Sequence, residues 1–208
     1  MGKTAARVAR TAAETSSRRN RDAEILDAAT TVFSQKGYSA ASLQEIADRV
    51  GILKGSLYHY IDSKESLLFR ILQHSHEEAT EIMQAVDALD LPTEQKFLTY
   101  INRLATYYLS HLERASLYQS EWRYLEGDFD KQVRAQRRTF AGYLRAILDA
   151  AVDEKLAPAD LDTDLTTKYI LSALDSIPSW YRSTPPRQIE DLAAGVTDLA
   201  HASVFRRR

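Results

Sequence analysis

The chain has 208 residues, which is enough for one sizeable core or for a small module joined to a larger helical domain. It contains no cysteine, which excludes disulfides, thiolate metal ligands and cysteine nucleophiles. No apolar run of about 18 residues occurs, and no apolar stretch follows the basic N-terminal residues. The sequence therefore predicts neither a membrane span nor a secretory signal peptide, and we expect a cytoplasmic protein.

The formal net charge is only −2, but the charge is unevenly distributed. Residues 1–21 carry six basic side chains and one carboxylate, whereas residues 71–208 carry 16 basic and 21 acidic side chains. A basic end on an acidic body is typical of a protein that meets a polyanion, although a solvated disordered tail has the same composition. Because residues 1–17 show no sustained apolar periodicity, we predict a flexible basic arm over residues 1–19.

Three helices are predicted after this arm. Apolar residues recur at helical spacing from Arg21 to Lys36, and the following glycine is suited to end that helix. Residues 42–45, Ser-Leu-Gln-Glu, match the capping box that opens a short helix, which ends at the next glycine, residue 51. A second short helix is predicted over residues 54–60, with Leu53 and Leu57 facing inward.

Two short helices joined by a glycine-containing turn and packed on a preceding helix are typical of a helix-turn-helix. The second helix of this motif enters the major groove of DNA, where its first side chains meet base edges. Lysine and serine there can donate to bases or phosphates, glycine permits close approach, and tyrosine and histidine suit phosphate oxygens. The predicted DNA-contacting residues are Ser42, Lys54, Gly55, Ser56, Tyr58, His59 and Lys64.

Six further helices are predicted in the rest of the chain. They span about 62–89, 93–108, 118–125, 129–154, 163–181 and 187–204, with breaks at prolines and glycines. No alternating run of β-branched residues predicts a strand. We therefore expect an all-α fold of about nine helices, with a three-helix helix-turn-helix domain over residues 20–68 and a larger ligand-binding and dimerisation domain over residues 69–208.

The larger domain shows features of a ligand site. Aromatic residues concentrate between residues 97 and 143; such a stripe is more often plain core, but many tyrosine hydroxyls favour a cavity. The predicted helix 129–154 also carries a basic row, which is either a solvated face or a site for a phosphate or carboxylate. The expected ligand-binding residues are Tyr100, Leu104, Tyr118, Trp122, Arg138, Phe140 and Arg182.

The last two predicted helices are strongly apolar on one face. These faces, over residues 163–181 and 187–204, are too extensive to be covered within one chain. The small residues Ala193, Ala194 and Gly195 would permit close approach of another helix. We therefore expect a homodimer with a two-fold interface through these two helices.

Residues 25–68, which begin ILDAATTVFSQKGYSAASLQEIADRVG and end ILKGSLYHYIDSKESLL, resemble the DNA-binding region of TetR-family repressors. Gly37, Ser42, Gly51, the run from Gly55 to Tyr58 and the run Ser63-Lys64-Glu65 fall where the family pattern places them, while Tyr60 replaces the usual phenylalanine. The resemblance implies a nine-helix dimer, whose last two helices form a four-helix bundle with those of the partner, and a ligand cavity. It favours a repressor over an activator, a choice that the residues alone leave open.

A second, shorter resemblance concerns the effector. The segments Gln136-Arg137-Arg138 and Trp180-Tyr181-Arg182 are similar to TetR-type repressors of actinobacterial lipid and sterol catabolism that respond to acyl-coenzyme A thioesters. This similarity implies an acyl-CoA effector. The expected partners are thus double-stranded operator DNA, a small-molecule effector and a second copy of the chain, with no membrane and no cofactor.

Functions from other classes have less support. No nucleophile elbow or glycine-rich phosphate loop occurs, so we expect no enzyme activity. His74 and Glu78 have the spacing of helical metal ligands, but a polar helix face is the simpler interpretation, and no metal is predicted. A helical protein-interaction bundle without DNA binding is the main alternative, although it leaves the polar face of residues 54–60 unexplained.

Overall fold

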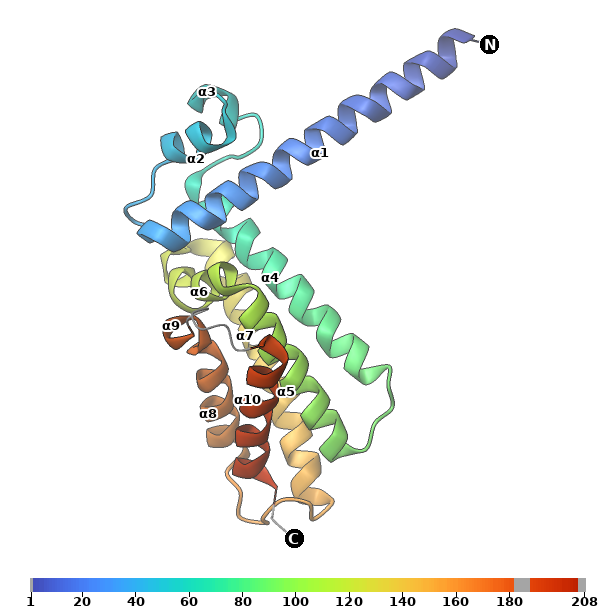
Figure 1. Cartoon of the computed structure of the whole chain (residues 1–208), viewed down its shortest axis with the longest axis vertical. Coiled ribbons are helices and arrows are strands. Elements are labelled where there is room, and N and C mark those ends of the chain that lie inside the picture. The colour runs from blue at the N-terminus through green and yellow to red at the C-terminus, as the bar shows by residue number, and fades with distance from the viewer. Residues whose placement is uncertain (1, 182–187, 206–208) are drawn as a thin grey trace. The chain divides into compact units, whose positions relative to one another are not determined.

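The computed structural model describes residues 2–181 and 188–205, with side chains from Arg18 onward (Figure 1). Within these residues the regular elements are ten α-helices and one 3₁₀ helix, with no strand. The single turn α9 (Ile177–Trp180) follows α8 (Thr163–Asp175) after one residue, and η1 (Glu121–Tyr124) directly continues α6 (Leu112–Ser120). Each of these pairs matches one predicted helix, which confirms the all-α fold of nine helices.

The chain forms two compact units, one up to Ile71 and the other from Leu72 onward. The division falls inside α4 (Lys64–Asp87), so one continuous helix contributes residues to both units. Position 68, where the sequence pattern places the domain boundary, also lies in α4.

In the first unit, α1 (Gly2–Lys36) packs on α2 (Leu43–Val50), which packs on α3 (Lys54–Leu57). The helix α1 begins at Gly2, earlier than the start near Arg21 that apolar spacing predicts. Apolar spacing detects a face that packs, whereas residues 3–20 contain several alanines and no proline, a composition that favours a helix without such a face. The core of this unit includes Ile25, Ala29, Phe33, Ile46, Ala47, Leu57, Leu67 and Leu68.

In the second unit, α5 (Thr93–Ser110) is the central helix. It contacts α7 (Gly127–Asp153), α8 and α10 (Ile189–Val204), and α7 and α10 both contact α8 (Figure 1). The Asp162 side chain caps α8 by accepting the Leu165 N–H over 2.9 Å. No described helix is both long enough and apolar enough to cross a membrane. The core around α5 includes Phe97, Tyr100, Ile101, Leu104, Leu144, Leu148, Ile170, Leu174 and Ala193.

Candidate DNA interface and ligand cavity

The turn between α2 and α3 has the geometry of a helix-turn-helix. Gly51 ends α2 with a left-handed backbone (φ 73°), and across it the Ile52 N–H donates to the Ala47 carbonyl oxygen over 3.0 Å. At the start of α2 the Ser42 hydroxyl accepts from the Glu45 N–H, and the Glu45 carboxylate accepts from the Ser42 N–H. The predicted capping box and glycine turn are therefore confirmed.

Most of the expected DNA-contacting residues lie on the exposed side of α3 or directly after it. Lys54, Gly55 and His59 are exposed, and Tyr58 is 52% exposed, whereas Ser56 is half-buried. None of these five residues is part of the buried core, so they are available to a macromolecular surface.

The prediction that Leu53 and Leu57 both face inward is wrong for Leu53. Leu57 is completely buried, but Leu53 is 79% exposed. Leu53 is the N-cap of α3 and has an extended backbone (φ −69°, ψ 144°), so helical spacing does not relate its direction to that of Leu57.

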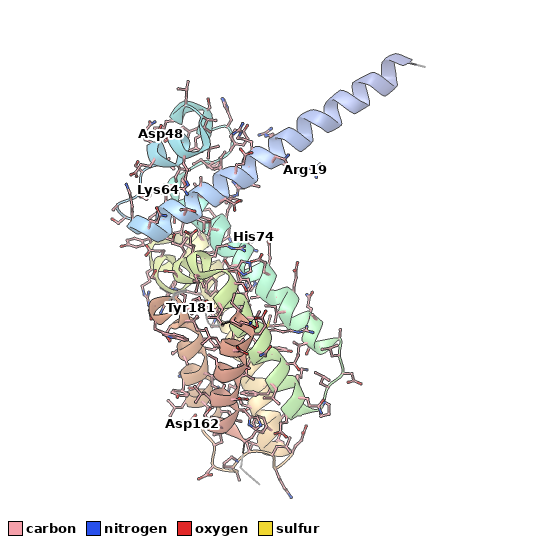
Figure 2. The ribbon with its side chains drawn as sticks, in the orientation of Figure 1. Arg19, Asp48, Lys64, His74, Asp162 and Tyr181 are labelled. Atoms are coloured by element: carbon pink, nitrogen blue, oxygen red, sulfur yellow. The ribbon has the colours of Figure 1, made fainter. Side chains whose placement is uncertain are left out.

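Ser42 and Lys64 already have partners inside the first unit. The Ser42 hydroxyl serves the capping box, and Lys64 is the first residue of α4 (Figure 2). The Lys64 Nζ donates to the Ser39 carbonyl oxygen over 3.3 Å and lies 4.4 Å from the centre of the Tyr38 ring. Partial burial lowers the pKa of Lys64. Any contact that these two residues make with DNA therefore competes with contacts inside the chain.

Two ion pairs brace this unit. Lys36 at the end of α1 pairs with Glu45 on α2, and this pair, with hydrogen bonds from Ser42, lowers the pKa of Glu45 to about 2. Arg70 on α4 pairs with Asp22 on α1 and donates to the Tyr60 carbonyl oxygen over 3.2 Å. The segment after α3 is thereby held against helices that precede and follow it.

A cavity of about 330 Å³ lies within the second unit. Residues from α4, α5, α6, α7 and α8 line it, and much of its wall is apolar or small, as at Ala79, Leu104, Ala115 and Phe140. An apolar cavity with a few polar groups is the usual form of a small-molecule site.

The expected ligand-binding residues divide into three groups. Leu104, Tyr118, Arg138 and Phe140 line the cavity. Tyr100 and Trp122 are not among its lining residues: Tyr100 is completely buried in the core, with its ring centre 4.9 Å from that of Tyr143. Trp122 is half-buried beneath arginine side chains. Arg182 lies outside the described residues.

The polar part of the cavity wall is a network that sequence analysis missed. The Tyr108 hydroxyl donates to Asp175 Oδ1 over 2.6 Å, and Arg137 Nη2 lies 3.4 Å from Asp175 Oδ2. Arg137 also donates to the Tyr118 carbonyl oxygen over 3.2 Å. Tyr107 and Tyr108 follow Leu104 at helical spacing, a signal that could have identified them, but no local pattern links Arg137 to Asp175.

A second polar cluster lies beside the first. The Tyr107 hydroxyl and Arg114 Nη1 both donate to Glu78 Oε2, over 2.8 and 2.9 Å, and Arg114 Nη1 lies 2.7 Å from His74 Nδ1. Glu78 is thus engaged by two donors. Within the described residues, no group of three or more histidine and acidic side chains is arranged to hold a metal ion.

The basic row on α7 separates into two parts. Lys131, Arg134 and Arg145 pair with nearby carboxylates on the surface, which is the arrangement of a solvated helix face. Arg137 and Arg138 instead line the cavity. Arg138 is exposed and has no ion-pair or hydrogen-bond partner among the described residues, so its guanidinium is the available cation at the cavity.

Buried hydroxyls in this unit stay protonated at neutral pH. Burial raises the pKa of Tyr118 to about 12, against the effect of the nearby Arg137 charge. The Tyr118 hydroxyl has no hydrogen-bond partner among the described residues, and neither has that of Tyr100.

Large apolar side chains are exposed on both α8 and α10, and this set of residues is named the apolar strip. Leu165 and Tyr169 are each 62% exposed on α8, and Leu199 is 75% exposed on α10. A Cβ atom added to Gly195 would meet nothing within 4 Å, so packing inside the chain does not require a glycine there. Ala193, expected to admit a second helix, is instead buried in the core of its own chain.

Comparison with known proteins connects both units to one group of regulators. Residues 25–71 match the family model described as "Bacterial regulatory proteins, tetR family", and residues 90–204 match "Tetracyclin repressor-like, C-terminal domain". The HTH-type transcriptional repressor KstR2 of Rhodococcus jostii is 27% identical over 170 residues, which cover 81% of this chain and 83% of the relative.

Solved structures show the same fold. The ketosteroid transcriptional regulator KstR2 of Mycobacterium tuberculosis superimposes with a TM-score of 0.84 at 21% identity, over 90% of this chain and 96% of that chain. AibR in complex with isovaleryl coenzyme A and operator DNA superimposes with a TM-score of 0.78 at 21% identity, over 86% and 97% of the two chains.

Proposed function

The chain belongs to the TetR family of bacterial transcription regulators, and we propose that it is a homodimeric repressor that an acyl-coenzyme A thioester releases from operator DNA. One observation carries the choice of effector: an apolar cavity in the second unit has in its wall the guanidinium of Arg138, which pairs with no group in the described part of the chain. A ligand with an apolar part and an anionic head matches this combination, because a guanidinium binds phosphate and carboxylate oxygens well.

The size of the cavity supports a ligand of which one part lies inside the cavity and another part outside it. Its volume of about 330 Å³ is at the lower end of the range of roughly 300–1,000 Å³ that is common for small-molecule sites. It suits an acyl group but not a complete coenzyme A thioester, whose nucleotide would lie outside, on the side of Arg138. Arg182 is proposed as a further cation for this nucleotide. The complex of AibR with isovaleryl coenzyme A is a precedent for such an effector in this fold.

The polar wall supplies further ligand contacts in this proposal. The unpartnered hydroxyl of Tyr118 is a donor for an oxygen atom of the ligand, and Leu104 and Phe140 contact its apolar part. In this proposal Tyr100 and Trp122 support the wall from behind and do not contact the ligand. The Arg137 Cζ atom lies 5.1 Å from the centre of the Tyr118 ring and 5.3 Å from that of the Trp122 ring.

The first unit supplies the proposed DNA contacts. Lys54 and Ser56 read base edges, Gly55 permits close approach, and Tyr58 and His59 bind phosphates. Ser42 and Lys64 contribute phosphate contacts, and residues 1–19 add a basic arm. A regulator with this role acts where the chromosome is, in the cytoplasm.

The proposed dimer uses the apolar strip of α8 and α10. Leu165, Tyr169 and Leu199 expose large apolar surfaces, which a two-fold axis would bring against the same residues of a second copy. A dimer also matches the two half-sites of a palindromic operator.

Coupling between effector and DNA is proposed to run through α4. This helix carries Ser75 and Ala79 in the cavity wall, and its first turn, with Lys64, belongs to the DNA-binding unit. A displacement of α4 by the ligand would change the affinity for the operator, with a coupling free energy of typically 1–3 kcal/mol, or about 5–150-fold. Neither catalysis nor a bundle without DNA contacts is needed to account for these features.

The effector class is tested by titrating the protein–operator complex with acyl-coenzyme A thioesters, free fatty acids and neutral aromatic compounds, while DNA release is followed by fluorescence anisotropy. We expect release by thioesters, and at least about tenfold weaker release for Arg138→Ala. Arg145→Ala on the same helix is the matched control, because Arg145 pairs with carboxylates away from the cavity. Release by neutral aromatic compounds alone, equal in both variants, would contradict an anionic effector.

A further inference from the structure

Leu53 is exposed where a buried or polar residue would be expected. Of its side chain and backbone surface, 79% is accessible, more than for any other large apolar residue that the structure describes as exposed. Its neighbour Ile52 is half-buried and Leu57 is completely buried, so the apolar side chain at position 53 is separate from the core of the unit.

Leucine is also unfavourable at this position for the helix itself. Leu53 is the N-cap of α3, where serine, threonine, asparagine or aspartate would accept an orphan backbone N–H, and no side-chain hydrogen bond caps α3. Replacing such a capping residue by an apolar one usually destabilises the helix. The residue therefore contributes neither core packing nor a cap, and these two observations point to a role outside the chain.

The surroundings of Leu53 indicate what it meets. Lys54 and Gly55 follow it directly on the exposed side of α3, and the exposed Arg49 precedes it in α2. Exposed basic side chains near one exposed apolar side chain in the sequence suit the major groove, which has phosphates at its rims and a single apolar group on its floor, the 5-methyl of thymine. A protein partner would favour a wider apolar patch than this single leucine.

We infer that Leu53 is a specificity-determining residue whose side chain contacts the 5-methyl group of a thymine in each operator half-site. This inference rests on the proposed DNA-binding function and adds to it a residue and a base. It assigns hydrogen-bonding contacts to Lys54 and Ser56 and one apolar contact to Leu53.

The experiment begins with the full chain and a random duplex pool, from which operator sequences are selected. Each thymine of the selected operator is then replaced, one at a time, by deoxyuridine, which lacks the methyl group but keeps the same hydrogen bonds. We expect the wild-type dissociation constant to rise about fourfold at one thymine of each half-site, the value for one methyl group lost from an apolar contact.

Two variants assign this effect to Leu53. Leu53→Ala should bind the thymine and deoxyuridine operators equally at that position and keep the wild-type response at the other thymines. Leu53→Ser should show the same loss of discrimination with unchanged or raised thermal stability, because serine is a favoured cap. Leu89→Ala, which truncates an exposed leucine in the turn after α4, is the matched control and should retain the wild-type discrimination.

Two outcomes would overturn the inference alone: equal wild-type binding at every deoxyuridine position, or the same deoxyuridine response in Leu53→Ala as in wild type. In both, operator binding itself persists. If no sequence were enriched from the pool, the DNA-binding function would fail as well, so the two failures are distinguishable.

Discussion

The Tyr108 hydroxyl on α5 donates to the Asp175 carboxylate on α8 over 2.6 Å, at the wall of the ligand cavity. Arg137 on α7 is the second partner of this carboxylate, at 3.4 Å. One carboxylate thus links three helices that line the cavity. Because the Asp175 side chain is only 19% exposed, these two donors replace much of the water that its oxygen atoms would otherwise bind.

Removal of the Tyr108 hydroxyl should therefore destabilise the second unit. Tyr108→Phe leaves a nearly buried carboxylate with one donor fewer, and we expect a loss of about 1–3 kcal/mol in the free energy of unfolding. Urea unfolding followed by circular dichroism measures it. Tyr143→Phe is the control, because the Tyr143 hydroxyl donates to Asp87, which is 52% exposed and can bind water instead. Equal losses of unfolding free energy in the two variants would show that the Tyr108–Asp175 hydrogen bond stabilises the fold no more than the exposed Tyr143–Asp87 hydrogen bond does.

The Lys36–Glu45 pair predicts a dependence of stability on acid pH. The folded state lowers the pKa of Glu45 from 4.5 to about 2, so ionised Glu45 stabilises the fold above pH 4.5. As pH falls from 4.5 toward 2, this contribution should disappear. Thermal unfolding between pH 7 and pH 2 should show a flatter profile for Glu45→Gln than for wild type. Glu81→Gln, at an exposed position of α4, is the control and should give the wild-type pH profile. If Glu45→Gln also gave the wild-type profile, the Lys36–Glu45 pair would not contribute to the pH dependence of stability.

Charge at the exposed apolar strip should dissociate the proposed dimer. Leu199→Asp replaces an apolar side chain that is 75% exposed by a carboxylate, which the folded chain can leave in water. Burial of this charge between two copies would be unfavourable, so the chain should fold as a monomer and bind the operator more weakly. Sedimentation velocity at micromolar concentration would detect the change. Leu192→Asp should instead reduce folding stability, since Leu192 packs partly against the core. A stable dimer of Leu199→Asp would place the interface elsewhere.

Lys64 and Lys54 should differ in how their loss affects DNA binding. Lys64→Ala should weaken binding to all sequences alike and reduce the log–log salt slope by about 0.9, the value for one lost phosphate contact. Lys54→Ala should change the preference among operator variants, by about 1–3 kcal/mol for each lost base contact. Binding curves at several salt concentrations separate the two roles. A change of preference in Lys64→Ala without a change of slope would reverse the assignment.

The sequence predicted those parts of the fold that depend on local chemistry. The capping box at Ser42 and the left-handed turn at Gly51 are determined by a few adjacent residues, and both occur as expected. Leu53 shows the limit of periodicity, because the spacing to Leu57 ignores the extended backbone at the N-cap. The pairing of Arg137 with Asp175 joins residues from different helices, and such contacts follow from packing rather than from local pattern.

The turn at Gly51 and the burial of Leu57 have a consequence for how this regulator could diverge in evolution. The residues that shape the helix-turn-helix are distinct from Leu53, Lys54 and Tyr58, which face outward. A mutation at an outward position can change the preferred target site without disturbing the scaffold. Duplicated copies of such a gene could therefore acquire new targets through few substitutions, and exchange of these outward positions between relatives should transfer target preference with them.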